Sequence, residues 1–216
     1  GLSVYYLETV HDLSPFAAVI LPGSKNTRAD LDWLKRTGWA DRIRSYHASG
    51  GNVLGICGGY QMLGRTISDP DGLEGAPGET DGLCLLNADT RLAAPKTTTL
   101  ARFKWDDIEG TGYEIHMGRT ESTENASWLQ VIEQNGHPVD AADGCASRDG
   151  RVLGTYMHGL FDAPEVLARW LNHIGLSNLA VPAAHGFVAR DAQYELLATH
   201  FEQHADAAGL LNFFLR

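Results

Sequence analysis

The sequence predicts an α/β fold in which a mixed, mostly parallel sheet is flanked by helices. Short apolar runs at 17–21 and 52–56 have the length and composition of buried strands, and each borders a Pro-Gly or Gly-Gly pair. Between them, apolar residues recur at helical spacing. Strand, helix and strand in this order are typical of a parallel sheet that helices cover.

The first third of the chain alternates between expected strands and helices. Apolar runs predict strands over 4–7, 17–21 and 52–56. A helical pattern covers 27–47, and Gly38 is expected to divide it into two pieces. Another helical pattern follows Cys57 and includes Tyr60, Leu63 and Ile67.

The rest of the chain predicts a long loop, then strands, then helices. Gly, Pro and acidic residues fill 69–82, and long loops of this kind inside compact domains are often functional. Strands are expected next at 83–86, 98–105, 113–117, 129–133 and 152–157, with a hairpin turn around 148–150. Helices are expected at 164–174 and 191–215, the latter as one helix or two. We expect one domain over 1–216.

Composition excludes several classes of protein. The 216 residues are 44% hydrophobic and 20% charged, as in folded proteins with a sizeable core. A net charge of −10 argues against nucleic-acid binding and against binding to anionic membranes. The chain has no apolar run of about 20 residues and no signal peptide pattern. Three cysteines without metal-ligand spacing favour a reducing compartment, so we expect a cytoplasmic protein. The chain starts at Gly1 without a methionine, and we expect it to be a piece of a longer protein.

The sharpest local motif is GICGG at 55–59, between a predicted strand and a predicted helix. A nucleophile elbow places its reactive residue on such a tight turn and needs small neighbours, here Gly55, Gly58 and Gly59. The start of the following helix would favour the thiolate of Cys57. The N–H of Gly58 would point to a developing oxyanion. The alternative is that Cys57 is a small buried hydrophobe, as many free cysteines are. Cys84, in an apolar run, and Cys145, in a turn, are interpreted as structural.

A cysteine nucleophile needs a base, and two of the nine histidines are candidates. His158 follows a predicted strand, at the edge where open α/β sheets place their sites. His116 lies within the predicted strand at 113–117. Spacing only slightly favours His158. The histidines in the predicted helices (His173, His200 and His204) are expected at the surface.

The corner LPGSKN at 21–26 follows the predicted strand 17–21. Gly23 and Ser24 could offer backbone N–H groups that complete an oxyanion hole with Gly58. The alternative is a plain turn in which Ser24 or Asn26 caps a helix. Lys25 is not part of a G-x-x-x-x-G-K-[ST] motif, so no nucleotide site is expected in this chain.

Together these motifs resemble those of class I glutamine amidotransferase domains, whose α/β fold is flavodoxin-like. The resemblance is strongest to the glutaminase domains of cobyric acid synthases, and it extends from about residue 4 to the final helix. The segments that carry it are LPGSKNT at 21–27, GICGGYQMLG at 55–64, the DP-G-EG loop at 69–75, YEIHMG at 113–118 and GTYMHGLF at 154–161.

The resemblance implies a role for each motif residue. Cys57 would be the nucleophile, His158 the base, and Gly58 and Gly23 the oxyanion donors. The positions that would bind the substrate glutamine are Gln61, Ser24, His116 and Met117. No metal or cofactor is implied in this domain.

One position departs from the broader class. Triad-type glutaminases have an acid two residues after the histidine, and this chain has Leu160 there. The resemblance therefore implies a Cys–His dyad, as in the cobyric acid synthase branch.

The same resemblance implies that ammonia from glutamine amidates carboxylates of a corrin ring in cobalamin biosynthesis. An amino-terminal synthase domain, absent from this chain, would bind Mg-ATP and the corrinoid. One alternative is a glutaminase of a related ligase, either cobyrinic acid a,c-diamide synthase or a lipid II amidating complex. Another is a non-catalytic glutaminase-like module that only binds a partner.

Overall fold

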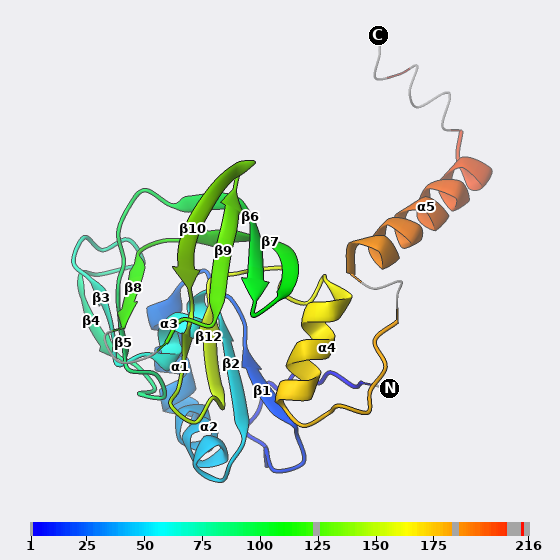
Figure 1. The fold of residues 1–216 in the computed structure, drawn as a ribbon. Coiled ribbons are helices and arrows are strands. Elements are labelled where there is room, and N and C mark those ends of the chain that lie inside the picture. Colours follow the sequence, from blue (N-terminus) through cyan, green and yellow to red (C-terminus); the bar gives the residue numbers. More distant parts are fainter. Residues whose placement is uncertain (1, 123–125, 183–185, 207–212, 214–216) are drawn as a thin grey trace.

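The computed structural model describes residues 2–122, 126–182, 186–206 and 213 (Figure 1). The helices are α1 (Thr27–Thr37), α2 (Trp39–Ala48), α3 (Gly58–Leu63), α4 (Pro164–His173) and α5 (Gly186–His204). The strands are β1 (Ala18–Leu21), β2 (Asn52–Ile56), β3 (Thr66–Asp69), β4 (Gly78–Asp81), β5 (Ala88–Arg91), β6 (Thr97–Trp105), β7 (Ile108–His116), β8 (Arg119–Ser122), β9 (Leu129–Gln134), β10 (His137–Asp143), β11 (Cys145–Ala146) and β12 (Val152–Thr155).

The central sheet has the strand order β1-β2-β12-β11. β1, β2 and β12 run parallel, and β11 adds antiparallel to β12 through the hairpin expected around 148–150. The α/β prediction is confirmed. Because the three parallel strands are adjacent, their carboxyl ends meet at one edge of the sheet.

The two faces of this sheet are covered by different layers, as Figure 1 shows. Alternate residues of a strand point to opposite faces. Val53 and Val152 pack with the buried side chains of α1 and α2. Leu54 and Leu153 pack with α4 and with the antiparallel strands β6 and β9. The expected helical pieces on either side of Gly38 are confirmed as α1 and α2.

Two further sheets stand beside the central one, and the sequence indicated them only in part. The first, β10-β9-β6-β7, is antiparallel throughout. The second, β4-β3-β5-β8, is mixed. Sequence reasoning missed β3, β4, β5, β8 and β10, and it assigned Ile67 of β3 to a helix. The strands β4 and β8 are short, polar and mostly exposed, so apolar alternation does not reveal them.

The strand expected at 4–7 is wrong. Residues 2–17 contain no strand, and Val4, Tyr5 and Tyr6 are largely exposed. The central sheet ends at β1, so this apolar run has no strand to pair with.

The strand expected at 83–86 is also wrong, although Leu83 and Leu86 are buried. The N–H groups of Leu83 and Leu85 donate to the carbonyls of Met62 and Leu63 at 2.8 and 2.9 Å. The run therefore satisfies carbonyls at the end of α3, which have no partner within the helix. Cys84 lies at a φ of 55° and is exposed, so its interpretation as a buried structural cysteine is wrong too.

The loop expected at 69–82 is shorter than predicted. β4 pairs antiparallel with β3, with Asp69 opposite Gly78, and 70–77 form the loop between them. The side chain of Asp69 is buried and accepts the N–H groups of Leu73 and Glu74 at 2.8 and 2.9 Å. One buried carboxylate thus fixes the loop against the end of β3.

The helix expected at 164–174 is confirmed as α4. The helix expected at 191–215 coincides with α5 over 191–204. Its residues 207–212 and 214–215 lie outside the described part of the chain. Figure 1 shows α5 projecting away from the sheets. Among the described residues, no helix combines the length and apolar character that a bilayer span requires.

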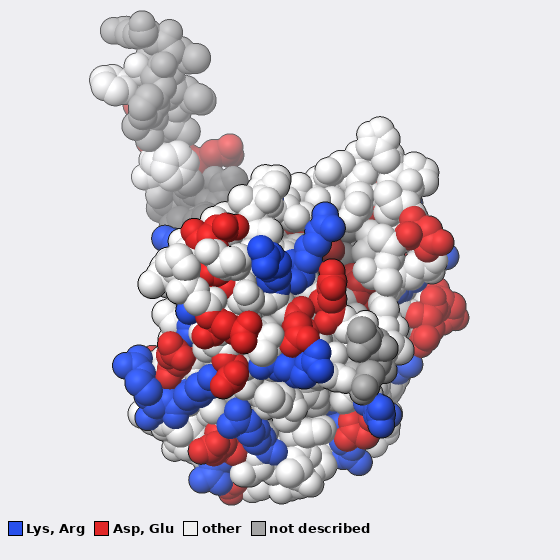
Figure 2. All heavy atoms as spheres, turned by 90° about the vertical axis from the view of Figure 1, so that its left-hand side faces the viewer, with Lys and Arg blue, Asp and Glu red and all other residues white. Residues whose placement is uncertain are grey.

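Charged side chains of both signs are interleaved on the face that carries β3, β4, β5 and β8 (Figure 2). Ion pairs join Arg28 to Asp69 at 3.6 Å and Arg44 to Asp41 at 3.1 Å. On this face the Lys and Arg side chains do not gather into one patch.

Candidate active site

Three loops meet at the carboxyl edge of the central sheet. Gly23 follows β1, Cys57 follows β2 and His158 follows β12. A methyl group added at Gly23 would stand 3.2 Å from Cε1 of His158 and 3.7 Å from Cβ of Cys57. The parallel order of β1, β2 and β12 thus brings together three residues that the sequence singled out.

Cys57 occupies a strained turn, as the elbow prediction requires. Its φ is 53° and its ψ is −111°, a conformation that side-chain-bearing residues rarely adopt. A methyl group at Gly58 would stand 2.8 Å from the backbone nitrogen of Ser24, and one at Gly59 would overlap the carbonyl oxygen of Leu21. The glycines after Cys57 therefore allow α3 to start in contact with the corner after β1.

The thiol of Cys57 is buried, and in the free protein this burial outweighs the favourable position at the start of α3. Burial raises the pKa of Cys57, and Glu74 also disfavours the thiolate. The N–H of Gly58 and the charge of Lys96 act in the opposite direction but do not compensate. The thiol donates to the carbonyl of Ile115 at 3.5 Å. The start of α3 thus favours the thiolate through the N–H of Gly58, as expected, but burial has the larger effect on the pKa of Cys57.

This environment predicts how Cys57 reacts in the absence of substrate. Alkylation by iodoacetamide needs the thiolate, and a raised pKa lowers the thiolate fraction at neutral pH. We expect the rate of alkylation at Cys57 to rise with pH. The midpoint of this rise should lie above about 8.5, the ordinary pKa of a thiol. Mass spectrometry of each cysteine checks this, with the exposed Cys84 as internal reference. A midpoint below 7 at Cys57 would contradict it.

The imidazole of His158 and the side chain of Cys57 both lie beside Gly23, and among the described residues the imidazole has no charged hydrogen-bond partner. Its backbone pairs with that of Tyr113, with N···O distances of 2.8 and 3.1 Å. Nε2 is buried and has no hydrogen-bond partner among the described residues. Burial lowers the pKa of His158. The neutral ring is therefore the resting form, ready to accept a proton.

Leu160 occupies the position of a triad acid, and it is part of the core. Its side chain is fully buried and packs among the apolar residues of α4 and the antiparallel sheet. Within the described ranges, no carboxylate hydrogen-bonds Nε2 of His158.

Gln61 lies within hydrogen-bonding distance of three elements. Its Oε1 accepts from the hydroxyl of Thr27 at 3.0 Å. Its Nε2 donates to the carbonyl of Met117 and to the hydroxyl of Tyr156, both at 3.1 Å. The side chain predicted to hold glutamine thus ties α3 to α1, to the residue after β7 and to the segment before His158.

The loop at 70–77 joins this network through Glu74. Its carboxylate accepts the N–H of Thr27 at 2.6 Å. Burial raises the pKa of Glu74. Arg28 binds the same loop, donating to the carbonyl of Ala76 at 2.6 Å. The loop that the sequence marked as functional therefore contacts the start of α1, next to the elbow.

His116 and Met117 lie at the end of β7, beside the elbow. The ring of His116 stacks on Tyr156 with 3.7 Å between centroids, and its Nδ1 lies 3.2 Å from the carbonyl oxygen of Gly118. Burial, and to a smaller extent His158, lowers the pKa of His116. The ring of His116 thus packs on the residue after β12, whereas the ring of His158 lies beside Gly23, as Cys57 does.

Ser24 and Asn26 shape the corner after β1. The side chain of Asn26 caps α1 by accepting from Ala29 N at 3.1 Å, so one form of the capping interpretation is confirmed. The hydroxyl of Ser24 binds Asp30 and accepts from Asn26 N at 3.0 Å. Ser24 contacts Gly58 through its backbone.

Two buried acids lie under the site, and sequence reasoning identified neither. Asp143, only 6% exposed, accepts from the hydroxyl of Thr155 and from Tyr156 N at 3.2 Å. Burial raises its pKa. Glu114, 8% exposed, points inward from β7, and its burial together with the charge of Asp143 raises its pKa to about 7. Asp143 thereby fixes the end of β12, from which the chain reaches His158.

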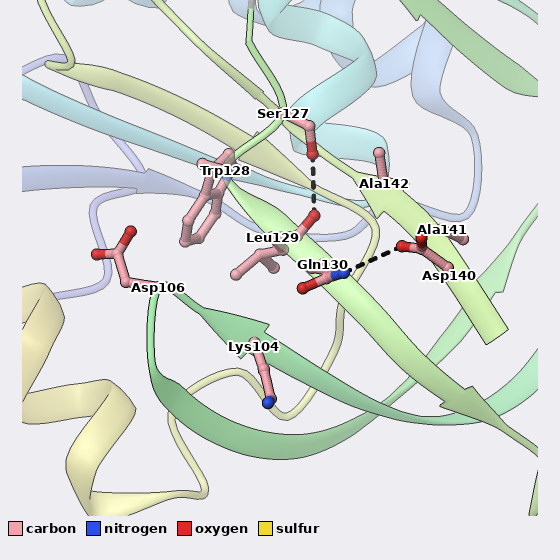
Figure 3. A pocket seen from close by; sticks show the side chains of 9 residues that line it. All are labelled: Lys104, Asp106, Ser127, Trp128, Leu129, Gln130, Asp140, Ala141 and Ala142. Atoms are coloured by element: carbon pink, nitrogen blue, oxygen red, sulfur yellow. Dashed lines mark hydrogen bonds between the residues drawn. The ribbon is translucent and has the colours of Figure 1, made fainter. Parts of the chain in front are cut away.

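A hollow of about 300 Å³ lies elsewhere, over β6, β9 and β10 (Figure 3). Polar side chains line much of it, and Gln130 donates to Asp140 across it at 3.0 Å. None of the residues predicted for the site lines it. In the described part of the chain, no group of three or more His, Cys, Asp or Glu is arranged to hold a metal ion.

Comparison with known families shows to which family this chain belongs. The profile of the CobB/CobQ-like glutamine amidotransferase domain matches residues 2–166. The chain belongs to this family. The resemblance inferred from the motifs is thereby confirmed.

Relatives of this CobB/CobQ-like domain are cobyric acid synthases. That of Chlorobium phaeobacteroides is 43% identical over 218 residues, which cover all of this chain and 43% of that protein. That of Cereibacter sphaeroides is 47% identical over 199 residues, which cover 89% of this chain and 39% of that protein. The chain spans about two fifths of the length of these relatives.

Solved structures show the same fold for this CobB/CobQ-like domain. A glutamine amidotransferase structure matches 76% of the chain with a TM-score of 0.52 at 18% identity. The structure of PurLQS from Thermotoga maritima matches 80% of the chain with a TM-score of 0.54 at 14% identity. These likenesses confirm the predicted fold class.

Sequence reasoning on this CobB/CobQ-like domain missed the residues that support the site. Tyr113, Tyr156 and Asp143 are separated from Cys57 by 56 to 99 positions. Tyr113 and Tyr156 lie in the segments YEIHMG and GTYMHGLF, which gave a signal without assigning these two residues a role, and Asp143 belongs to no local motif.

Proposed function

We propose that this chain hydrolyses glutamine through a Cys57–His158 dyad and releases ammonia. The observation that carries the proposal is the meeting of Gly23, Cys57 and His158 at the carboxyl edge of the sheet. A nucleophile, a base and backbone N–H donors in one place are the parts that acyl transfer needs.

The resting state of the dyad is a neutral thiol beside a neutral imidazole, since burial disfavours both charged forms. His158 takes the proton from Sγ as the sulfur attacks the carboxamide carbon of glutamine. The N–H groups of Gly58 and Gly23 stabilise the oxyanion. His158 then gives its proton to the leaving nitrogen, so ammonia departs and a γ-glutamyl thioester remains.

Hydrolysis of the thioester restores the enzyme. His158 accepts a proton from water, and the hydroxide attacks the thioester carbonyl. When the carbon–sulfur bond breaks, Cys57 recovers its proton from His158 and glutamate leaves. One glutamine and one water thus give one glutamate and one ammonia.

Substrate binding would involve the residues around the elbow. The contacts that support this are those of Ser24 with Gly58, of Gln61 with the carbonyl of Met117, and of His116 with Tyr156. The side chain of Gln61 already bonds three neighbours, so its role would be to hold the side chain of Thr27 at the start of α1 and the carbonyl of Met117 in place for glutamine.

The use of the ammonia is part of the proposal. The relatives are cobyric acid synthases more than twice as long as this chain. The ammonia would amidate corrin-ring carboxylates at an Mg-ATP-dependent synthase domain of the same polypeptide, in the cytoplasm. A related ligase, either cobyrinic acid a,c-diamide synthase or a lipid II amidating complex, is the alternative acceptor system.

A glutamine-analogue electrophile tests the glutaminase proposal. We expect 6-diazo-5-oxo-norleucine to add one equivalent at Cys57, and glutamine to protect against the addition. Peptide mass spectrometry locates the label. Cys57→Ser should lose it, and the matched variant Cys84→Ser should keep it.

The same experiment separates the alternatives. Labelling that persists in Cys57→Ser would contradict the nucleophile assignment. Absence of labelling and of glutamate release in the full chain would favour the non-catalytic module instead.

A further inference from the structure

The imidazole of His158 is fixed in place although it lacks the acid of a triad. Leu160 fills that position, and Nε2 has no hydrogen-bond partner among the described residues. A base that turns freely seldom has the correct geometry for proton transfer, so another group must orient the ring. The surroundings of His158 identify that group.

The ring of Tyr113 lies parallel to the ring of His158. Their centroids are 5.0 Å apart and the planes differ by 6°. Antiparallel backbone hydrogen bonds at both amides of the pair hold the two residues opposite each other. A methyl group at the neighbouring Gly112 would overlap the carbonyl oxygen of His158, so β7 approaches this segment as closely as glycine allows.

Gly23 lies beside the same ring on a second loop. A methyl group there would stand 3.2 Å from Cε1 of His158, so a glycine at this position leaves the space that the imidazole occupies. Tyr113 itself is 38% exposed, and its ring is not part of either apolar core. Among the described residues, His158 is the ring that stacks on this side chain.

We propose that Tyr113 is the positioning residue for His158 and orients the imidazole by ring stacking, in place of a carboxylate. This inference rests on the proposed dyad. The face of an aromatic ring also attracts a cation, so Tyr113 stabilises the imidazolium that forms when Cys57 attacks. The phenol hydroxyl has no part in either effect.

Kinetics of two substitutions test the role. Tyr113→Leu removes the ring, and we expect kcat for glutamine hydrolysis in the full chain to fall roughly tenfold, with KM within twofold. Tyr113→Phe keeps the ring and should stay within about twofold of the wild type. Tyr194→Leu, on the exposed α5, is the matched control and should change neither constant.

The pH profile provides a second readout. The titratable groups that face His158 are Cys57, Tyr113 and His116. Losing the ring face should destabilise the imidazolium, so the acid limb of kcat/KM should move to lower pH in Tyr113→Leu and stay in place in Tyr113→Phe. An unchanged limb in Tyr113→Leu would count against the proposal.

Three kinetic outcomes would overturn it. The first is that Tyr113→Leu changes neither kcat nor KM. The second is that Tyr113→Phe loses as much kcat as Tyr113→Leu does. The third is that Tyr113→Leu raises KM and leaves kcat unchanged, which would indicate substrate contact instead.

A spectroscopic readout separates this inference from the glutaminase proposal. The Cε1 proton of His158 should carry a ring-current shift in NMR spectra, and Tyr113→Leu should remove it while Tyr113→Phe keeps it. This result is informative even if the wild type hydrolyses no glutamine. A shift that Tyr113→Leu leaves unchanged would overturn the stacking role, whatever the activity.

Discussion

Replacing His158 with alanine is expected to reduce kcat for glutamine hydrolysis by about 10² to 10⁴, the range in which a positioned acid–base group contributes. The resting thiol of Cys57 is protonated because burial raises its pKa, so it needs a base before it can attack. Neither the oxyanion donors nor the start of α3 removes that proton. Burst measurements of the thioester and steady-state glutamate release give the effect on each step.

His116→Ala is the matched control for His158→Ala. Both rings are in the site region and both have a pKa lowered by burial, but His116 stacks on Tyr156. We expect His116→Ala to weaken glutamine binding or to lower the stability of the protein. It should reduce kcat much less than His158→Ala does. If the His158 variant kept near wild-type turnover, the dyad would be wrong, and if only His116→Ala lost turnover, the base would be reassigned.

Replacing Glu114 with glutamine is expected to stabilise the protein at high pH. In the folded state the pKa of Glu114 is raised from 4.5 to about 7, so folding favours its protonated form. Glu114 makes its full contribution to the free energy of unfolding below pH 4.5, and this contribution is lost as the pH rises through 7. The loss amounts to roughly 3 kcal/mol at pH 8. Glutamine has no such charge, so Glu114→Gln should unfold at higher denaturant concentration than the wild type at pH 8 and at a similar one at pH 4.

Glu79→Gln controls for the loss of a negative charge as such. Glu79 lies on β4 and is exposed, whereas Glu114 lies inward on β7 next to Asp143. We expect Glu79→Gln to leave the denaturant concentration at unfolding unchanged at pH 4 and at pH 8. A Glu114→Gln variant less stable than the wild type at pH 8 would show that Glu114 is ionised and stabilising in the fold.

Local patterns predicted the elements with strong apolar signals and failed elsewhere. The strands β1, β2, β6, β9 and β12 and the helices α1, α2 and α4 were expected at nearly the observed positions. The runs at 4–7 and 83–86 have equal apolar character but no partner strand, and pairing is decided by tertiary structure. The polar strand β4 shows the reverse case, because its pairing with β3 gives it order without an apolar signal.

In the candidate site, too, some residues could be predicted from local patterns and others could not. The elbow could be predicted because the strand, Cys57 and the glycines lie within a few residues. The assignment of His158 required sheet order as well, since only the adjacency of β2 and β12 brings it to Cys57. The contacts of Tyr113, Asp143 and Glu114 depend on how β7 and β10 pack on the central sheet, and no local pattern contains that information.

The turn at Cys57 also has a consequence for evolution. A side chain held at a φ of 53° in a sparsely populated region typically costs about 1–3 kcal/mol. Selection for stability alone would therefore favour glycine here, the one residue that adopts such angles freely. In lineages where the domain lost its reaction, this codon should drift early, while the flanking glycines, which contact backbone, should persist. If Cys57 is the proposed nucleophile, retention of cysteine at this position records selection on activity, at a site where the fold itself would prefer another residue.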